Sequence, residues 1–497
     1  MAEASYGGCA SEGNPRRQST REPTAARTYA RALPIVPVRA RGLTVEGADG
    51  RRYLDCLSGA GTLALGHNHP VVLEAIREVL DSGAPLHALG LATPVEDAFL
   101  AELFRSLPPG LADHARVQFC GPGGTDAVEA ALGLVREATG RTGVLAFADA
   151  WQGMGEGLGE EAFGDACCGV GGVGGPDGVG GLDGVDGVAF EGARDGVSNG
   201  AFTAPGAGGV AGMIVEVVQG EGGVVPAPDA WLRRLRQLTA DRSIPLIVDE
   251  TETGVGRTGA FWAVEHSGIT PDVMVLSKAI GGSLPLSVVV YRDDLDIAEP
   301  AAPASAFRGN QLAMAAGTAT LAHVRRHRLA ERASILGARM LAHLRSLQGQ
   351  FDCVGDVRGR GLMLGVELVH PEFEGGAAVS GGAGGGGGEV AVTCSPLGGD
   401  LGVTADRFAE APSPTVAPSS AAPELAAAVQ RECLRRGLIV DLGGPRANVI
   451  RLLPPLTISD EQAEAVLDRL SDAVEAAARD HAAHGEKQQP QYAARAG

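Results

Sequence analysis

The segment Val273–Gly282 (VMVLSKAIGG) constrains this chain more than any other stretch. Its first four residues are apolar, and a short run rich in valine is typical of a buried strand. Lys278 comes shortly after the run, and Gly281 and Gly282 follow it. A lysine at the end of a buried strand is destabilising unless its charge is paired, neutralised or used chemically. Lys278 therefore either extends to solvent or forms a Schiff base with a carbonyl compound.

A second apolar run, Ile244–Asp249, ends in a carboxylate and favours the Schiff-base interpretation. Pyridoxal phosphate needs a lysine and a carboxylate, because its aldehyde bonds to the lysine and its ring nitrogen stays protonated only beside the carboxylate. Asp249 and Lys278 at the ends of neighbouring strands would supply them. We therefore predict pyridoxal 5'-phosphate as the cofactor, in a site built around these two residues.

Strands and helices alternate from about residue 117 to residue 290, which predicts a mostly parallel sheet flanked by helices. Within this region a strand, the glycine-rich loop Gly121–Asp126 and a helix follow one another. This order points free backbone N–H groups and a helix dipole at a phosphate, although a glycine-rich turn alone is weak evidence. Ligands of parallel sheets bind where the strands end. Residues at such predicted ends are Asp249, Lys278, Trp151 and the loop Gly123-Gly124-Thr125.

Length, charge and cysteine usage narrow the class of protein. A chain of 497 residues can bury the core of a two-domain enzyme. The net charge of −19 argues against a nucleic-acid partner. No stretch approaches a membrane span, and the N-terminus lacks the apolar core of a signal peptide. The eight cysteines include no CxxC pair, so we expect reduced thiols, a cytoplasmic location and no metal site.

Glycine, at 74 residues, is concentrated in two blocks that show no apolar periodicity. We predict irregular structure in the first block, residues 153–212, and a disordered surface insertion at 374–423. We expect an α/β chain with a large domain and a smaller α+β domain. The predicted divisions are a disordered leader at 1–28, an N-terminal segment of the small domain at 29–65, the large domain at 66–325, the C-terminal small domain at 326–480 and a disordered tail at 481–497.

Several motifs match the pattern of a known enzyme family. They are Asp249-Glu250 with Thr253–Gly259, Ser277-Lys278, Glu216 with Gln219–Glu221, Arg358–Gly361, and Arg451 with Pro454–Leu456. On these residues the chain resembles the class III pyridoxal-phosphate aminotransferases, which have fold type I, over residues 29–477. Within the family it is most similar to the diaminobutyrate–2-oxoglutarate aminotransferases. That similarity rests on Leu33–Pro37, Ser58–Pro70, Phe119–Pro122 with Gly124–Ala131, and Phe307–Gln311.

The resemblance implies a role for each matched residue. Lys278 would hold the cofactor aldehyde and then move the proton, and Asp249 would keep the ring nitrogen protonated. The phosphate would bind Gly124 and Thr125. Arg451 would bind a substrate carboxylate, and would pair with Glu221 when the substrate offers an amine instead. The remaining implied cofactor contacts are Gly123, Trp151 as the stacking ring, Gln152 and Glu252.

Four positions depart from the family pattern. Glu252 stands where a glutamine usually contacts the phenolic oxygen of the cofactor, and two anions there would repel unless Glu252 is protonated or turned away. Ala306 stands where a threonine usually reaches the phosphate of the neighbouring subunit, a bond worth about 1.5–3 kcal/mol. Gln152 replaces a histidine, and Gly123 replaces a small hydroxyl or methyl residue. The first glycine-rich block also replaces a segment that carries substrate contacts in relatives.

The reaction implied by the resemblance is glutamate plus aspartate 4-semialdehyde giving 2,4-diaminobutyrate plus 2-oxoglutarate. The partners implied are amino acid and 2-oxo acid substrates and a second copy of the chain in a homodimer. Two alternatives stay open. One is an aminotransferase for another ω-amine donor such as ornithine, 4-aminobutyrate or lysine. The other is a catalytically impaired protein of the same fold, which the departures at Gln152, Glu252 and Ala306 and the first glycine-rich block favour.

Overall fold

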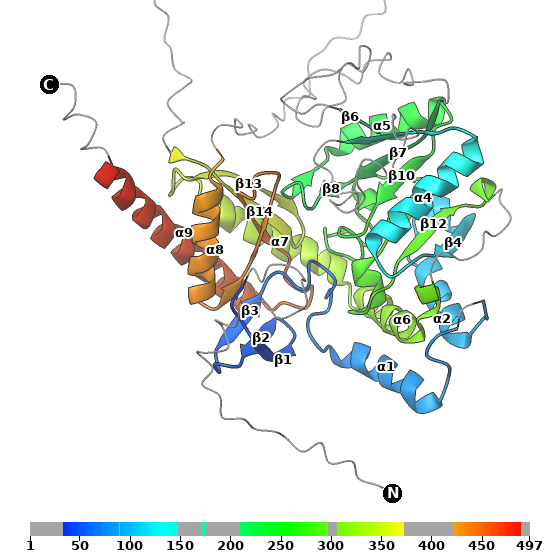
Figure 1. Ribbon diagram of the computed structural model, residues 1–497, viewed down its shortest axis with the longest axis horizontal. Helices are drawn as coiled ribbons and strands as arrows, with labels where there is room; N and C mark the ends of the chain where they lie inside the picture. The colour runs from blue at the N-terminus through cyan, green and yellow to red at the C-terminus, as the bar shows by residue number, and fades with distance from the viewer. Residues whose placement is uncertain are drawn as a thin grey trace, which may run out of the picture.

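The computed structural model describes residues 33–88, 90–147, 170–173, 209–296, 306–371 and 421–488, and every structural statement below refers to them (Figure 1). The predicted leader at 1–28, Trp151 and Gln152 lie outside the described residues, as do most of the first glycine-rich block and residues 374–420 of the predicted insertion.

A seven-stranded sheet forms the centre of the large domain, in the order β4-β12-β11-β10-β7-β5-β6. Its strands are β4 (Ala115–Phe119), β5 (Gly143–Phe147), β6 (Val170–Val173), β7 (Val210–Glu216), β10 (Leu246–Asp249), β11 (Val273–Leu276) and β12 (Val288–Arg292). Strand β12 runs antiparallel to both of its neighbours, β11 and β4, and the other pairings are parallel. Every residue of β7, β10 and β11 is buried, which explains their unbroken apolar sequences. The predicted mostly parallel sheet is confirmed.

Helices cover both faces of this sheet because successive side chains of a strand point to opposite sides. Ile247 packs in a cluster with Val128 and Ala131 of α4 (Gly124–Thr139). Val248, the next residue, belongs to the cluster that includes Leu235 of α5 (Asp229–Asp241). Further helices of the large domain are α1 (Pro70–Ser82), α2 (Pro94–Phe104), α3 (Pro109–Ala112) and α6 (Gln311–Arg326). Figure 1 shows α4 lying across the sheet and α1, α2 and α6 grouped together.

The second domain combines residues from both ends of the chain. Strands β1 (Pro37–Arg41), β2 (Thr44–Gly47) and β3 (Arg52–Asp55) form a sheet that β15 (Leu438–Ile439) completes by pairing in parallel with β3. A four-stranded antiparallel sheet has the order β13-β14-β17-β16. Its strands are β13 (Val354–Arg360), β14 (Met363–Leu368), β16 (Asp441–Gly443) and β17 (Val449–Leu452), and the helices beside it are α7 (Leu329–Ser346), α8 (Pro423–Arg435) and α9 (Asp460–Gln488).

The structure corrects two sequence predictions. Residues 153–212 are not irregular throughout, because β6 lies inside this block and β7 begins at its end. The valines of β6 pair in register with β5, and β-branched residues favour such an edge pairing. The disordered tail predicted from residue 481 is also wrong at its start, since α9 continues to Gln488. Alanine, glutamate and lysine favour this continuation, and Pro490 lies just beyond it.

Two short strands, β8 (Val218–Gln219) and β9 (Val225–Pro226), form a hairpin after β7. Single-turn 3₁₀ helices occur at Ala263–His266, Lys278–Gly281, Asp293–Leu295 and Ala306–Gly309. None of the described helices is both long and apolar enough to cross a bilayer.

Candidate active site

Three adjacent strands bring their polar ends together. Asp249, the last residue of β10, pairs in register with Glu216, the last residue of β7. On the other side Asp249 pairs with Val275 of β11, and Lys278 begins the 3₁₀ helix that follows β11. Lys278 has a φ of +49°, a left-handed conformation that costs a non-glycine residue free energy and is concentrated at functional sites. The prediction that Asp249 and Lys278 come from neighbouring strands is confirmed.

The two buried carboxyl groups of these strands differ in environment. Asp249 is 3 % exposed and accepts a 2.8 Å hydrogen bond from the backbone N–H of Thr251. Glu216 accepts one from Gly220 N at 3.0 Å, while its second oxygen is buried without a partner. Burial raises the pKa of both carboxyls, and the neighbouring Asp249 raises that of Glu216 further, well above its ordinary value. Glu216 therefore favours its neutral form.

Glu252 lies between two cations. Its Oε1 is 3.4 Å from Lys278 Nζ, and its Oε2 is 3.8 Å from Arg451 Nη1. Gly61 and Gly220 border this carboxylate, and a side chain at Gly220 would overlap it, with a Cβ only 1.7 Å from Oε2. The carboxylate is thus held in the centre of the site and is not turned away from Lys278.

Arg451 is the buried cation of the small domain, at 2 % exposure on β17. Its Nη2 lies 2.9 Å from Glu221 Oε1, so the predicted pair is present. The same nitrogen contacts Asp441, which the sequence analysis missed. The signal was available, because Asp441 and Arg451 stand opposite each other in antiparallel register around a turn that begins with Gly444. The Nε and Nη1 atoms of Arg451 are buried without a hydrogen-bond partner.

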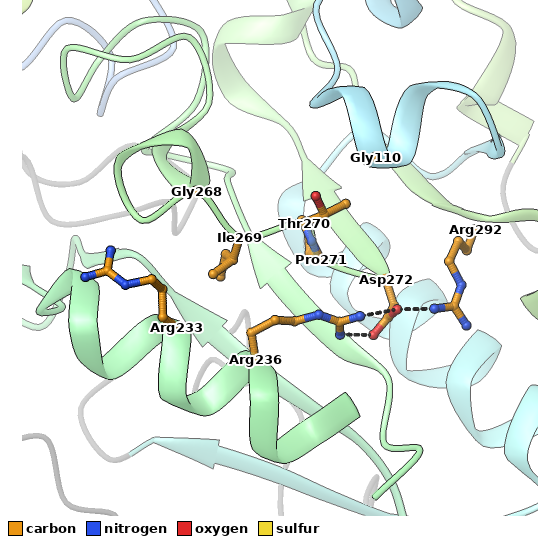
Figure 2. A pocket seen from close by; sticks show the side chains of 9 residues that line it. All are labelled: Gly110, Arg233, Arg236, Gly268, Ile269, Thr270, Pro271, Asp272 and Arg292. Atoms are coloured by element: carbon orange, nitrogen blue, oxygen red, sulfur yellow. Dashed lines mark hydrogen bonds and ion pairs between the residues drawn. The ribbon is translucent and has the colours of Figure 1, made fainter. Parts of the chain in front are cut away.

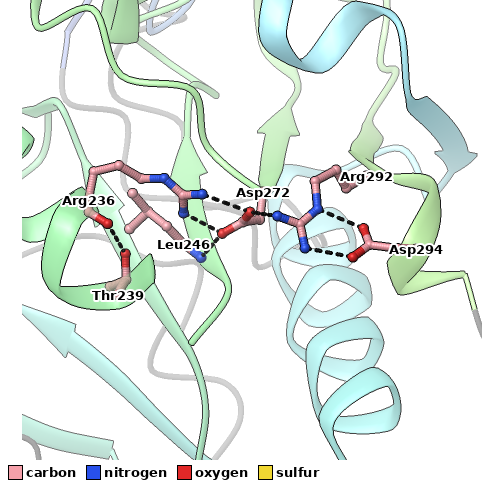
Figure 3. Close-up of polar contacts among 6 residues, drawn as sticks. All are labelled: Arg236, Thr239, Leu246, Asp272, Arg292 and Asp294. Atoms are coloured by element: carbon pink, nitrogen blue, oxygen red, sulfur yellow. Dashed lines mark hydrogen bonds and ion pairs between the residues drawn. The ribbon is translucent and has the colours of Figure 1, made fainter. Parts of the chain in front are cut away.

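A separate cavity of about 350 Å³ lies at the opposite end of the strands, where β10 and β11 begin (Figure 2). Its buried carboxylate, Asp272, is paired with Arg236 at 2.5 Å and with Arg292 at 2.6 Å. Asp272 also accepts a 2.8 Å hydrogen bond from Leu246 N, so its side chain joins helix α5 to strands β10 and β12 (Figure 3). This network is structural, and it contains none of the predicted site residues.

The comparison with protein families decides the identity of the fold and its site. The family model for class III aminotransferases matches residues 24–158 and 201–474. This chain belongs to the class III aminotransferases. A curated diaminobutyrate–2-oxoglutarate aminotransferase from Rhizobium meliloti is 45 % identical and is covered over 92 % of each chain. Another from Haemophilus influenzae is 38 % identical, covering 90 % of this chain and 92 % of the relative.

Solved structures agree with the fold of a class III aminotransferase. Ornithine aminotransferase from Toxoplasma gondii superposes with a TM-score of 0.67 at 24 % identity, covering 92 % of this chain and 93 % of that one. A transaminase from the marine bacterium Virgibacillus gives a TM-score of 0.68 at 20 % identity, with 93 % and 98 % covered. At these identities the likeness shows the fold, which is the predicted α/β fold of type I.

Class III aminotransferases use pyridoxal 5'-phosphate, and the residues present fit this cofactor. Helix α4 begins at Gly124, and Asp126 in its first turn accepts a 3.0 Å hydrogen bond from the backbone N–H of Gly123, the residue before the helix. A Cβ at Gly124 would lie 3.2 Å from Thr251 Cγ2, a tight contact, so glycine keeps the helix N-terminus open beside the strand ends. The Thr251 hydroxyl is buried without a partner there. The carboxyl ends of the strands thus offer the α4 N-terminus for a phosphate, Asp249 for a ring nitrogen and Lys278 for an aldehyde.

The remaining predicted contacts divide into two groups. Gly123, Gly124, Thr125, Asp249, Glu252 and Lys278 all lie on elements that meet at the carboxyl ends of the strands. Trp151 and Gln152 lie outside the described residues, so their roles stay predictions. Ala306 begins the 3₁₀ helix Ala306–Gly309. Its predicted position beside a neighbouring subunit stays a prediction as well.

Proposed function

We propose that this aminotransferase interconverts L-glutamate plus L-aspartate 4-semialdehyde and L-2,4-diaminobutyrate plus 2-oxoglutarate. The observation that carries the proposal is the Arg451–Glu221 pair, which faces Lys278 across the carboxylate of Glu252. Relatives named for this reaction, which are 33–45 % identical over 90–92 % of this chain, support the substrate.

Four residues would hold the cofactor in this proposal. Asp249 would bind the ring nitrogen, and the α4 N-terminus at Gly124 and Thr125 would bind the phosphate. When bound, pyridoxal phosphate supplies an electron sink for the substrate carbon that loses its proton. Lys278 Nζ would bind the aldehyde in the resting enzyme and carry the proton during the transfer. Glu216, neutral beside Asp249, lets Asp249 keep the negative charge.

Arg451 and Glu221 would let one site accept two kinds of substrate. Glutamate and 2-oxoglutarate carry a carboxylate that would bind Arg451, whose Nε and Nη1 are buried without a hydrogen-bond partner. Glu221 is the most exposed of the three carboxylates around Arg451, at 41 %, so it can move away at low cost. When the amine end of diaminobutyrate occupies the site, Glu221 would stay on Arg451 and neutralise it.

A homodimer and a cytoplasmic location are further parts of the proposal. Leu91 and Phe307 are 65 % and 70 % exposed, and a second copy of the chain would remove such apolar side chains from water. Phe307 follows Ala306, the position expected to reach the neighbouring subunit. The described cysteines, Cys56, Cys120, Cys353 and Cys433, are free, in keeping with a reducing compartment. Light scattering of the purified protein tests the dimer, and a monomer at working concentrations would contradict it.

The absorbance spectrum of the purified protein tests the reaction. With added pyridoxal phosphate we expect a band near the visible edge that bleaches with diaminobutyrate and returns with 2-oxoglutarate. Lys278→Ala should lose the band. Bleaching by ornithine, 4-aminobutyrate or lysine but not by diaminobutyrate would identify a different amino donor. A wild-type protein that forms no band would mean that the fold is kept for a purpose other than transamination.

A further inference from the structure

Three potential metal ligands meet in the small domain, and none of them is assigned to the active site. His370 follows β14, Glu424 lies in the first turn of α8, and His481 lies on α9. One ligand atom of each residue lies within 4.8 Å of the other two. His370 Nε2 is 3.1 Å from Glu424 Oε1, and the rings of His370 and His481 have centroids 6.0 Å apart.

We propose that His370, Glu424 and His481 bind a divalent transition-metal cation, with Zn²⁺ as the reference ion. Two imidazoles and one carboxylate form a donor set that suits zinc, with a fourth position left for water. Bonds of about 2.0–2.2 Å place tetrahedral ligand atoms about 3.4 Å apart. The distance of 3.1 Å between His370 and Glu424 already meets this spacing. The longest separation, at most 4.8 Å, would have to shorten on binding.

The site would join three elements that are far apart in the sequence but adjacent in the fold. An isolated bridge pairs Val369, next to His370, with Ala421, just before α8. A cation at this junction would hold the end of β14 and the start of α8 against the last helix. It would therefore stabilise the small domain and the attachment of α9 without touching Lys278 or Arg451. The net charge of −19 also favours the binding of cations over anions.

Isothermal titration of the full-length protein, stripped with chelator and then loaded with pyridoxal phosphate, tests the site. Zn²⁺ is the titrant, and Mg²⁺ serves as the comparison because it prefers oxygen ligands. The variants are His370→Asn, His481→Asn and Glu424→Gln. His114→Asn is the matched control, because His114 is an exposed histidine that also lies beside a carboxylate, 3.9 Å from Asp293. Circular dichroism establishes that each variant is folded.

The expected result is one saturable Zn²⁺ site per chain and no comparable binding of Mg²⁺. Each of the three site variants should weaken Zn²⁺ binding at least about tenfold, whereas His114→Asn should leave it unchanged. At the same Zn²⁺ concentration, the rise in the thermal unfolding midpoint should be smaller in the site variants than in the wild type and the control. Zn²⁺ binding that is equally tight in His370→Asn or His481→Asn, or a wild type without a saturable site, would overturn the proposal.

Discussion

The Glu252 Oε1 atom lies 3.4 Å from Lys278 Nζ, so the lysine predicted to bind the cofactor is already paired with a carboxylate. The other oxygen of Glu252 faces Arg451 at 3.8 Å. Glu252 therefore links the residue expected to do the chemistry with the residue expected to select the substrate. The resemblance to the family implies a neutral glutamine here, so we expect the negative charge to distinguish this chain from its relatives.

Replacing Glu252 by glutamine tests the effect of that charge. A nearby carboxylate favours the protonated form of an amine, so Glu252→Gln should lower the pH midpoint of the absorbance change of the cofactor-loaded enzyme by about one unit. The same change should tighten cofactor binding, because it removes an anion beside the expected position of the phenolic oxygen. The measurements are a spectroscopic pH titration and a cofactor titration. If neither quantity moves, the charge of Glu252 has no influence on the cofactor.

Glu221→Gln should change the preference between the two substrates. The variant removes the negative charge of Glu221, which we expect to stay paired with Arg451 when diaminobutyrate reacts. The ratio of kcat/KM for glutamate to that for diaminobutyrate should therefore rise about tenfold, equivalent to about 1.4 kcal/mol. Asp441→Asn is the matched control, since Asp441 contacts the same nitrogen from the neighbouring strand and should affect both substrates alike. Equal ratios in both variants would contradict a selective role for Glu221.

Asp272→Asn should destabilise the large domain. The buried Asp272 carboxylate holds Arg236, Arg292 and the backbone of Leu246, which begins β10. Loss of its charge leaves Arg236 without its carboxylate and Arg292 paired with Asp294 alone, at a cost of about 2–3 kcal/mol in the free energy of unfolding. Chemical denaturation of the full chain measures this cost. Asp294→Asn is the control, because the Asp294 side chain is 59 % exposed and its removal should cost less than about 1 kcal/mol.

Acid should destabilise the contact between α1 and α6 through His323. Burial, with the nearby His69 and His327, lowers the pKa of His323 to about 4. An unfolded chain protonates a histidine near pH 6.5, at about its model value. Between about pH 6.5 and pH 4 the unfolded state thus binds more protons, and the free energy of unfolding falls as the pH falls. Above about pH 6.5 His323 is neutral in both states, so it does not change the free energy of unfolding.

His323→Asn should flatten that pH dependence. Thermal unfolding midpoints of the wild type should fall as the pH is lowered from about 6.5 toward 4, and the variant should show a smaller fall over the same range. His343→Asn, a change at an exposed histidine of α7, should keep the wild-type slope. An unchanged slope in His323→Asn would mean that other groups dominate the acid response.

Local patterns in the sequence predicted the centre of the site. Asp249 and Lys278 were identifiable because each ends a short apolar run, and buried parallel strands place such ends at one edge. The loop before α4 was identifiable from its glycines. These predictions needed only the periodicity of the chain and the residues that interrupt it, both of which are local properties.

Only the tertiary structure decided which distant residues meet. The position of Glu252 between Lys278 and Arg451, and the contact of Glu221 with Arg451, depend on how the small domain packs against the sheet. The antiparallel direction of β12 and the meeting of His370, Glu424 and His481 likewise depend on pairing across long stretches of chain. A sequence pattern fixes what each segment can bury, whereas the partner of a buried charge is set by the register and packing of segments far apart in the chain.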